Sequence, residues 1–450
     1  MRQMWRYGQE AAKQEYGAAA QAGLRYSFVE GAFAAVMAGF TQEFFTPFIL
    51  LVGASVRQVA MLNALPNVTA AVLQLFIPAI AARLRSRRRM ICRFVLTQAL
   101  LLVPMAAIAL SGRNMPGIFI ACVVFFTAGG ALATPAWGSL MSDLIAADKR
   151  GAYFGWRNRT LGFVTVGSML LGGAFLHGMK RINPFYGFAL LFGGACVCRL
   201  FSWFLLNKMY EPPLEQKPEH HFTIVQFVRR IRESNFAKFV LFVALMSFSV
   251  NLASPFFSVL MLRELQFNYL LFTMITLTAT LTMLVTIARW GRHADIVGNL
   301  RVIRFTALLI GVVPLLWLVS RHPGYLFFAQ VASGFLWAGF NLCTSNFIYD
   351  AVMPEKRTRC IAYFNLFNGV ALCSGALVGG WMLPLLPATC GHKFLTLCII
   401  SGILRGAVGI GMPRLLREVR PVEKMHSDEL FFSMVGIRPL LGADRRTIRY

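Results

Sequence analysis

The chain alternates long apolar runs with short polar gaps. Twelve runs of roughly 18 to 28 residues can be distinguished, and each can cross a hydrocarbon core of about 30 Å as an α-helix. The pattern therefore predicts an all-α membrane protein with twelve transmembrane helices. The runs occupy residues 27–53, 58–82, 91–111, 116–142, 152–176, 185–207, 236–262, 269–290, 302–320, 324–350, 360–384 and 394–412. Prolines inside them are expected to kink the helices without breaking them.

Composition supports the bilayer as the solvent. Of the 450 residues, 57% are hydrophobic and 14% are charged, and the mean hydropathy is +0.60. A soluble chain of this length cannot bury so much apolar surface. The net charge of +25 would suggest nucleic acid in a soluble protein. Here the basic residues fall in short gaps between apolar runs, so we expect no nucleic-acid partner.

Basic residues are distributed unequally between the two sides of the predicted bundle. With the N-terminus in the cytoplasm, 35 of the 44 lysine and arginine residues fall in cytoplasmic segments and seven in outer loops. This bias places both termini in the cytoplasm and suggests a bacterial inner membrane. The remaining two, Arg199 and Arg405, lie within spans, and we expect their side chains to extend toward the inner membrane surface.

The polar gaps also suggest a domain division. The longest internal gap begins with a proline-rich stretch and ends in an amphipathic segment, 222–232, which suits a linker along the inner leaflet. We expect a cytoplasmic N-terminal segment (1–26), a six-helix bundle (27–207), the linker (208–235), a second six-helix bundle (236–412) and a cytoplasmic tail (413–450).

An internal repeat relates the two predicted bundles. An octet that reads acid, four residues, acid, Lys, Arg runs from Asp143 to Arg150 and again from Asp350 to Arg357, at an offset of 207 residues. A glycine pair in the fifth span returns in the eleventh at the same offset. Parallel repeats are one way in which transporters build a binding site at the membrane midplane.

The segment after the eighth span resembles a loop motif of the major facilitator superfamily. It reads Trp290-Gly291-Arg292-His293-Ala294-Asp295-Ile296-Val297-Gly298-Asn299-Leu300-Arg301, which is similar to Gly-x-x-x-Asp-x-x-Gly followed by basic residues. The first copy of the motif, at residues 83–89, keeps only its basic residues. With the span number, the linker and the repeat, the resemblance covers residues 27–412. It implies two pseudo-symmetric six-helix bundles.

The motif also suggests a cytoplasmic gate. Glycines allow a tight turn between adjacent helices, and Asp295 can then reach a basic partner near the start of the fifth span, such as Arg150, Arg157 or Arg159. The alternative is that Asp295 only makes a turn more soluble. We expect gate residues at Gly291, Asp295, Gly298, Arg301, Asp143, Arg150, Asp350 and Arg357.

Glu43 is an acidic side chain deep inside the first apolar run. Other acids lie in polar loops, in the tails or near the ends of runs. An ionisable group at this depth costs about 2.5–3.5 kcal/mol, which makes it a candidate functional residue. The local pattern returns 208 residues later around Asn251, and the pair Thr46-Pro47 is matched by Ser254-Pro255.

The resemblance implies that the first, fourth, seventh and tenth spans line a central cavity. Gln42 and Glu43 would point about 100° apart on a helix, so we assign only Glu43 to the cavity, as a proton carrier. The alternative is a structural Glu43, protonated and hydrogen-bonded between helices. The expected cavity residues are Glu43, Asn251, Thr46, Thr134, Trp137, Trp337, Asn341 and Thr344.

These features predict a secondary active transporter that moves a small solute by alternating access, with protons as the coupling ion. No Gly-x-x-x-x-Gly-Lys-Ser/Thr motif for ATP is present. A membrane-embedded enzyme acting on lipids is the main alternative, but His-Glu-x-x-His and Gly-x-Ser-x-Gly are both missing. The second alternative is a sensor that has a transporter fold but does not transport. We expect no catalytic residue, no metal, no cofactor and a monomer in the bilayer.

Overall fold

The computed structural model describes residues 17–74, 76, 86–145, 150–212, 234–352, 357–389 and 391–419. These residues are almost entirely helical, and their only β-pairing is an isolated bridge between Thr389 and His392. The amphipathic linker segment, most of the N-terminal segment and most of the tail lie outside the described residues. The prediction of an all-α membrane fold is confirmed.

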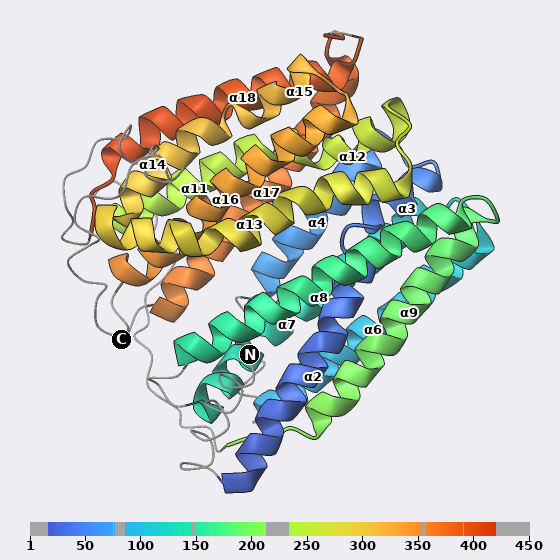
Figure 1. Cartoon of the computed structure of the whole chain (residues 1–450), viewed down its shortest axis with the longest axis vertical. Coiled ribbons are helices and arrows are strands. Elements are labelled where there is room, and N and C mark those ends of the chain that lie inside the picture. Colours follow the sequence, from blue (N-terminus) through green and yellow to red (C-terminus); the bar gives the residue numbers. More distant parts are fainter. Residues whose placement is uncertain are drawn as a thin grey trace. The chain divides into compact units, whose positions relative to one another are not determined.

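The described residues of the first half of the chain form six long helical segments (Figure 1). Two of them begin at side-chain caps: Ser86 accepts from the backbone N–H of Arg89, and Asn183 accepts from that of Phe185. The segments are α2 (Gly17–Thr41) with α3 (Phe45–Leu51), α4 (Val56–Gln74), α6 (Arg87–Ser111), α7 (Pro116–Leu144), α8 (Arg150–Met179) and α9 (Pro184–Asn207).

The second half is more often interrupted by short turns of other helix types. Its elements are α11 (Asn235–Asn251), η1 (Ser254–Phe256), α12 (Phe257–Val259), η2 (Leu260–Glu264), α13 (Tyr269–Val297), α14 (Asn299–Ile310), η3 (Val313–Leu315), α15 (Leu316–Val319), α16 (Pro323–Ala351), α17 (Arg357–Met382), η5 (Leu383–Leu385), α18 (Lys393–Gly411) and η6 (Met412–Leu415). Within the described ranges, eleven segments are long and apolar enough to cross a membrane. The predicted span missing from these eleven is the second, 58–82, which corresponds to α4; residues 77–85 beyond it are not described.

Two compact units can be distinguished by packing. The first comprises residues 1–218, 250–277 and 365–397, and the second comprises residues 219–249, 278–364 and 398–450. In the first unit α6 packs against α7 and α9, α2 packs against α8 and α9, and α4 packs against α7 (Figure 1). In the second unit α14 packs against α16.

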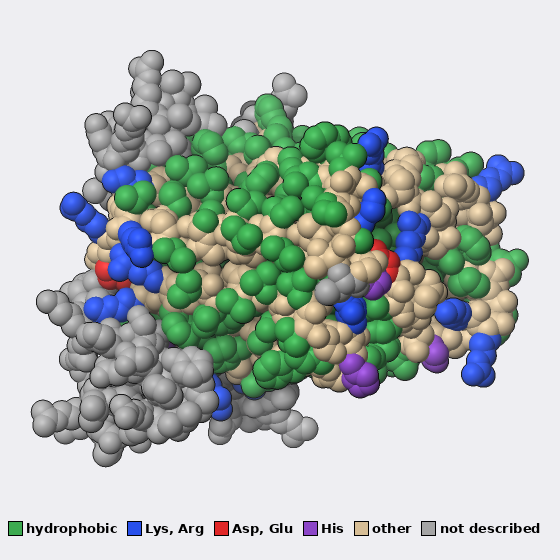
Figure 2. Space-filling model, turned by 90° about the horizontal axis from the view of Figure 1, so that it is seen from above, with side chains coloured by type: hydrophobic (Ala, Val, Ile, Leu, Met, Phe, Trp, Pro, Cys, Tyr) green, Lys and Arg blue, Asp and Glu red, His purple; other side chains and the backbone are tan. Residues whose placement is uncertain are grey.

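Large apolar side chains face outward as well as inward. Leu171 and Val285 are about two-thirds exposed, at 67% and 66%. Figure 2 shows many hydrophobic side chains on the visible face, with Lys and Arg side chains gathered in a few places. Water would solvate such a surface poorly, whereas lipid chains solvate it well. The prediction of an integral membrane protein is confirmed.

The first and seventh spans are both interrupted at their matched polar residues. The first breaks at the turn 42–44, between α2 and α3, and the seventh breaks between α11 and η1. Proline has no N–H, so Pro47 cannot donate to the carbonyl of Glu43, and Pro255 cannot donate to that of Asn251. Each polar residue therefore lies where a helical backbone bond is lost. The prediction that these prolines only kink their helices is wrong.

A single residue, Gly298, joins the eighth and ninth spans. It follows the last residue of α13 and has φ of +91° and ψ of 154°, a conformation that side chains with a Cβ rarely adopt. The predicted loop from Trp290 onward is instead mostly helical, because α13 continues to Val297. The expectation of a glycine turn is confirmed at Gly298 and wrong at Gly291, which lies within α13.

Replacing Gly298 by alanine is expected to lower the free energy of unfolding by about 1–3 kcal/mol, because alanine is strained at this φ and ψ. The matched control is Gly291→Ala, since a Cβ there would meet only Leu342 at 3.6 Å. That variant should be neutral or slightly stabilising. Denaturant unfolding in detergent measures both, and equal effects of the two substitutions would contradict the strained turn.

Glutamates 207 residues apart close the N-termini of α6 and α14. Glu211 accepts from the backbone N–H of Arg87 at 2.6 Å, and Glu418 accepts from that of Leu300 at 2.7 Å. A carboxylate at a helix N-terminus satisfies free N–H groups and complements the helix dipole. The two contacts lie in separate units, so each unit contains its own copy of the arrangement.

Matched glycines bring helices of the two sequence halves together within the first unit. A Cβ at Gly173 of α8 would overlap Thr273 of α13, and a Cβ at Gly380 of α17 would overlap Ala60 of α4. The two glycines are 207 residues apart, as the repeat predicts. Small residues allow helices to cross at short distances in a membrane.

Candidate functional site

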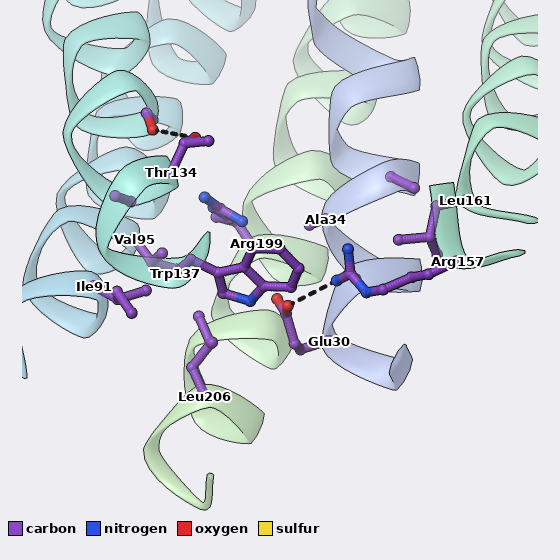
Figure 3. A pocket seen from close by; sticks show the side chains of 14 residues that line it. Glu30, Ala34, Ile91, Val95, Thr134, Trp137, Arg157, Leu161, Arg199 and Leu206 are labelled. Carbon is purple, nitrogen blue, oxygen red and sulfur yellow. Dashed lines mark hydrogen bonds and ion pairs between the residues drawn. The ribbon is translucent and has the colours of Figure 1, made fainter. Parts of the chain in front are cut away.

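A cavity of about 310 Å³ lies inside the first unit, among α2, α6, α7, α8 and α9 (Figure 3). The side chain of Thr134, at its wall, is exposed, so the cavity is not sealed. Aliphatic side chains form much of the remaining wall. The lining residues with polar or charged side chains are Glu30, Thr134, Trp137, Arg157 and Arg199.

An ion pair is buried at the cavity. Arg157 Nη2 lies 3.2 Å from Glu30 Oε1, and the two side chains are only 8% and 6% exposed. The same nitrogen donates to the backbone carbonyl of Ser27 at 3.0 Å. The Arg157 guanidinium also lies 4.2 Å from the ring centroid of Trp137, in a cation–π arrangement. Salt bridge, carbonyl and indole together hold Arg157 in place.

A second guanidinium, that of Arg199, is held by neutral side chains. Its Nε donates to Gln98 Oε1 at 3.1 Å, its Nη2 donates to the same oxygen, and its Nη1 donates to Ser202 Oγ at 3.4 Å. Ser202 Oγ in turn donates to Glu30 Oε2 at 3.1 Å. The Glu30 carboxylate is thus bound directly to one arginine and through a serine to the other.

Glycines on α2 and α7 make room for this cluster. A Cβ at Gly31 would overlap Nη2 of Arg157, and a Cβ at Gly130 would lie 2.8 Å from Nε2 of Gln98. Without a side chain at these positions, the long polar groups can lie flat against the neighbouring helix backbone. The cluster therefore depends on small residues on the opposing helices as well as on its own members.

The prediction that Arg199 and Arg405 extend to the membrane surface is wrong. Both are buried, and Arg405 Nε donates to Ser401 Oγ at 3.0 Å. A buried guanidinium is tolerated when its N–H groups find acceptors within the bundle. Arg157, one of the three arginines suggested above as partners for Asp295, forms an ion pair with Glu30.

Sequence reasoning missed Glu30. The first span was taken to begin at residue 27, which placed Glu30 near its end, whereas α2 begins at Gly17 and Glu30 lies in mid-helix. A usable signal was present in Arg199, since an arginine within an apolar span requires a buried acceptor. Within the predicted spans of the same bundle, Glu30 is the only acid besides Glu43.

Glu43 lies in the turn 42–44, and its side chain is exposed. No hydrogen bond or ion pair joins it to any residue in the described ranges, whereas its neighbours Phe44 and Phe45 are buried. Gln42 is exposed too. The helical-spacing argument that separated Gln42 from Glu43 is therefore wrong, because these residues do not form a helix.

The other predicted cavity residues are spread over both units. In the first unit Thr46 and Asn251 are half-buried, and Thr134 and Trp137 line the cavity beside the charged cluster. In the second unit three lie on α16: Trp337 is half-buried, Asn341 is exposed and Thr344 is buried, with no hydrogen-bond partner for its hydroxyl among the described residues.

The acids that begin the two repeated octets, Asp143 and Asp350, each contact a side chain of their own unit. Asp143 forms an ion pair with Arg87 at 2.5 Å, and Asp350 accepts from the amide of Asn299 at 2.8 Å. Of the remaining gate residues, Asp295 is exposed and Arg301 is half-buried. The side chains of Arg150 and Arg357 lie outside the described part of the chain.

The long apolar helices, the internal repeat and the charged cavity define a polytopic membrane protein with a polar site inside its bundle. The model of the Major Facilitator Superfamily matches residues 31–250 and again residues 239–442. The chain belongs to the Major Facilitator Superfamily. No curated protein sequence matches it at a significant level.

Solved structures share the fold at low sequence identity. A mutant of the nucleoside transporter NupG aligns with a TM-score of 0.69 and 10% identity, over 88% of this chain and 100% of that one. A bacterial homologue of the human lysosomal transporter Spinster, inward-facing and unoccupied, aligns with a TM-score of 0.63 and 13% identity, over 89% of this chain and 95% of that one. The family match supports a transporter and not an enzyme.

Proposed function

We propose that the protein is a secondary active transporter that moves a small solute by alternating access and couples this movement to protons. The observation that carries the proposal is Glu43, an exposed carboxylate at a helix break in the middle of the first span. Its matched partner in the repeat, Asn251, lies at the break of the seventh span and cannot carry a proton. Proton coupling through this pair would therefore depend on Glu43 alone.

An exposed carboxylate at mid-span faces either lipid or a water-filled cavity. The first is costly, and ionisable residues in membrane spans commonly mark ion or proton pathways. Interrupted helices are also a common way in which transporters build sites for substrates and coupling ions. Both features support a role for Glu43 as a group that takes up a proton on one side and releases it on the other. We place both termini in the cytoplasm and expect a monomer.

Uptake by purified protein in liposomes tests the proposal. With a pH-sensitive dye trapped inside, a panel of small solutes is added from outside, with and without an imposed pH gradient. We expect at least one solute to cause a protein-dependent proton flux and to accumulate only when the gradient is present. Uptake that ignores the gradient would contradict proton coupling, and the absence of any protein-dependent solute flux would contradict transport.

A further inference from the structure

The cavity in the first unit contains more positive than negative charge. Its lining residues include two guanidinium groups, those of Arg157 and Arg199, and one carboxyl group, that of Glu30. Two guanidinium groups and one carboxylate leave one positive charge without a counter-charge in the lining. An unbalanced buried charge is costly, and the cost falls when an ion of opposite sign binds.

The excess charge lies closest to Arg199. Arg157 has a direct ion pair with Glu30, whereas the acceptors that the structure gives Arg199 are Gln98 and Ser202, both neutral. Guanidinium groups form their strongest hydrogen bonds with carboxylate and phosphate oxygens, often through two N–H groups at once. An anionic group in the cavity would supply such an acceptor.

Arg157 has N–H groups left for a ligand. The Nη2 nitrogen of Arg157 donates both of the hydrogen bonds that this side chain makes to the described residues, one to the Ser27 carbonyl and one to Glu30 Oε1. Its Nε is buried without a hydrogen-bond partner among the described residues, and the side chain as a whole is more than nine-tenths buried. A buried donor left without a partner costs free energy, which a ligand oxygen would recover. Figure 3 shows the two guanidinium groups on different sides of the Glu30 carboxylate.

The rest of the cavity suits an apolar body. Ala34, Val95 and Leu161 contribute aliphatic wall, and Trp137 contributes an aromatic face. The volume of about 310 Å³ is close to the lower end of the range for small-molecule sites, about 300–1,000 Å³. A small organic molecule with one acidic end fits this division into a charged and an apolar part.

We propose that this cavity binds a substrate with an acidic group, a small organic carboxylate or phosphate ester, whose charge is held by Arg157 and Arg199 while its apolar body contacts Trp137 and the aliphatic wall. This proposal extends the transport function proposed above and rests on it, because the bound anion is a substrate only if the protein transports it. The binding of the anion itself can be measured without transport.

Titration calorimetry on the purified protein, with probes that share one ring, tests the charge preference. Benzoate and phenyl phosphate are anionic, benzamide is neutral and benzamidine is cationic. We expect at least one anion to bind about tenfold or more tightly than benzamide, because a charge-assisted hydrogen bond contributes at least this much. The ratio of benzoate to phenyl phosphate distinguishes carboxylate from phosphate ester. Equal or tighter binding of benzamide or benzamidine, or no anion binding, would overturn the proposal.

Inorganic phosphate tests the role of the apolar wall. It should bind more weakly than phenyl phosphate, because it lacks the ring that contacts Trp137 and the aliphatic side chains. Equal affinity for the two probes would overturn the organic part of the proposal.

Substitutions locate the binding. Arg199→Gln is expected to weaken binding of the preferred anion about tenfold or more. The matched control is Arg405→Gln, which also removes a buried guanidinium but in the second unit and outside the cavity lining. It should leave the affinity unchanged. Unchanged affinity in Arg199→Gln would place the anion elsewhere and overturn the assignment. If that variant fails to fold, Arg199→Lys is used in its place. Lysine keeps the positive charge but lacks the paired N–H donors of a guanidinium group, so the loss of anion affinity should be smaller.

The binding and liposome experiments distinguish a failure of the anion site from a failure of the proposed transport function. Anion binding without any solute flux in liposomes would support the anion site and contradict the transport function. Proton-coupled flux of a neutral or cationic solute, without anion binding, would support transport and overturn the anion site.

Discussion

Replacing Glu43 by glutamine is expected to abolish proton-driven uptake while leaving exchange of solute across the membrane intact. Glutamine has nearly the shape of glutamic acid but cannot bind and release a proton. The Glu43 side chain is exposed and has no hydrogen bond to the described residues that the substitution would remove, so the fold should be retained. Loss of coupling with retention of exchange would assign the proton to this side chain.

Liposome assays measure the two activities separately. Uptake driven by a pH gradient reports coupling, and counterflow of labelled against unlabelled solute reports alternating access alone. Gln42→Ala, at the exposed neighbour in the same turn, is the matched control and should keep both activities. Glu43→Asp should keep part of the coupling, because it restores a carboxylate. Full gradient-driven uptake by Glu43→Gln would show that the proton binds elsewhere, with Glu30 as the next candidate.

Replacing Glu30 by glutamine is expected to lower the free energy of unfolding by about 3–5 kcal/mol, because it leaves two buried guanidinium groups without a counter-charge. Arg157→Gln should destabilise by a similar amount, since it leaves the Glu30 carboxylate with only an indirect link to Arg199 through Ser202. The double variant should be less destabilised than the sum of the two single variants, because it removes the pair together.

Denaturant unfolding of the four proteins in detergent gives the coupling energy directly. Glu211→Gln serves as a control, because this half-buried acid caps a helix N-terminus and such a contact contributes up to about 2 kcal/mol. Additive effects of the two single substitutions would contradict a buried ion pair that acts as a unit. A loss no greater than that of Glu211→Gln would contradict the buried charge itself.

Most helices could be predicted from hydrophobicity, because in a bilayer a long apolar run has few alternatives to helix. The sixth span, predicted at 185–207, is observed as Pro184–Asn207. The eighth was predicted to end at residue 290 but continues to Val297. Hydropathy indicates where a chain leaves lipid, and a helix can continue into the polar region beyond.

The helix breaks could not be read from the same pattern. Residues 42–44 lie inside a long apolar run, and Pro47 lacks the N–H that would bond the carbonyl of Glu43. A hydropathy pattern does not register a missing backbone N–H. The spacing of proline four residues after the polar residue was visible in the sequence, but whether proline bends or interrupts a helix depends on its neighbours.

The candidate site was predicted only in part. Thr134 and Trp137 were named because they are polar or aromatic on a span expected to line a cavity. The contacts of Glu30 with Arg157 and Ser202 join residues 127 and 172 positions apart. Such contacts depend on how each helix is rotated in the bundle, and one sequence contains no direct signal of that rotation. Only the unfavourable burial of Arg199 indicated that an acid had to be near.

The two glutamates that close α6 and α14 have a mechanical consequence. Glu211 comes just before residues 213–233, which connect the two halves of the chain, and Glu418 comes just before the C-terminal residues 420–450. A pull on either segment would therefore act on contacts with the start of another helix: Glu211 and the carbonyl of Pro212 both bind Arg87, and Glu418 binds the backbone N–H of Leu300.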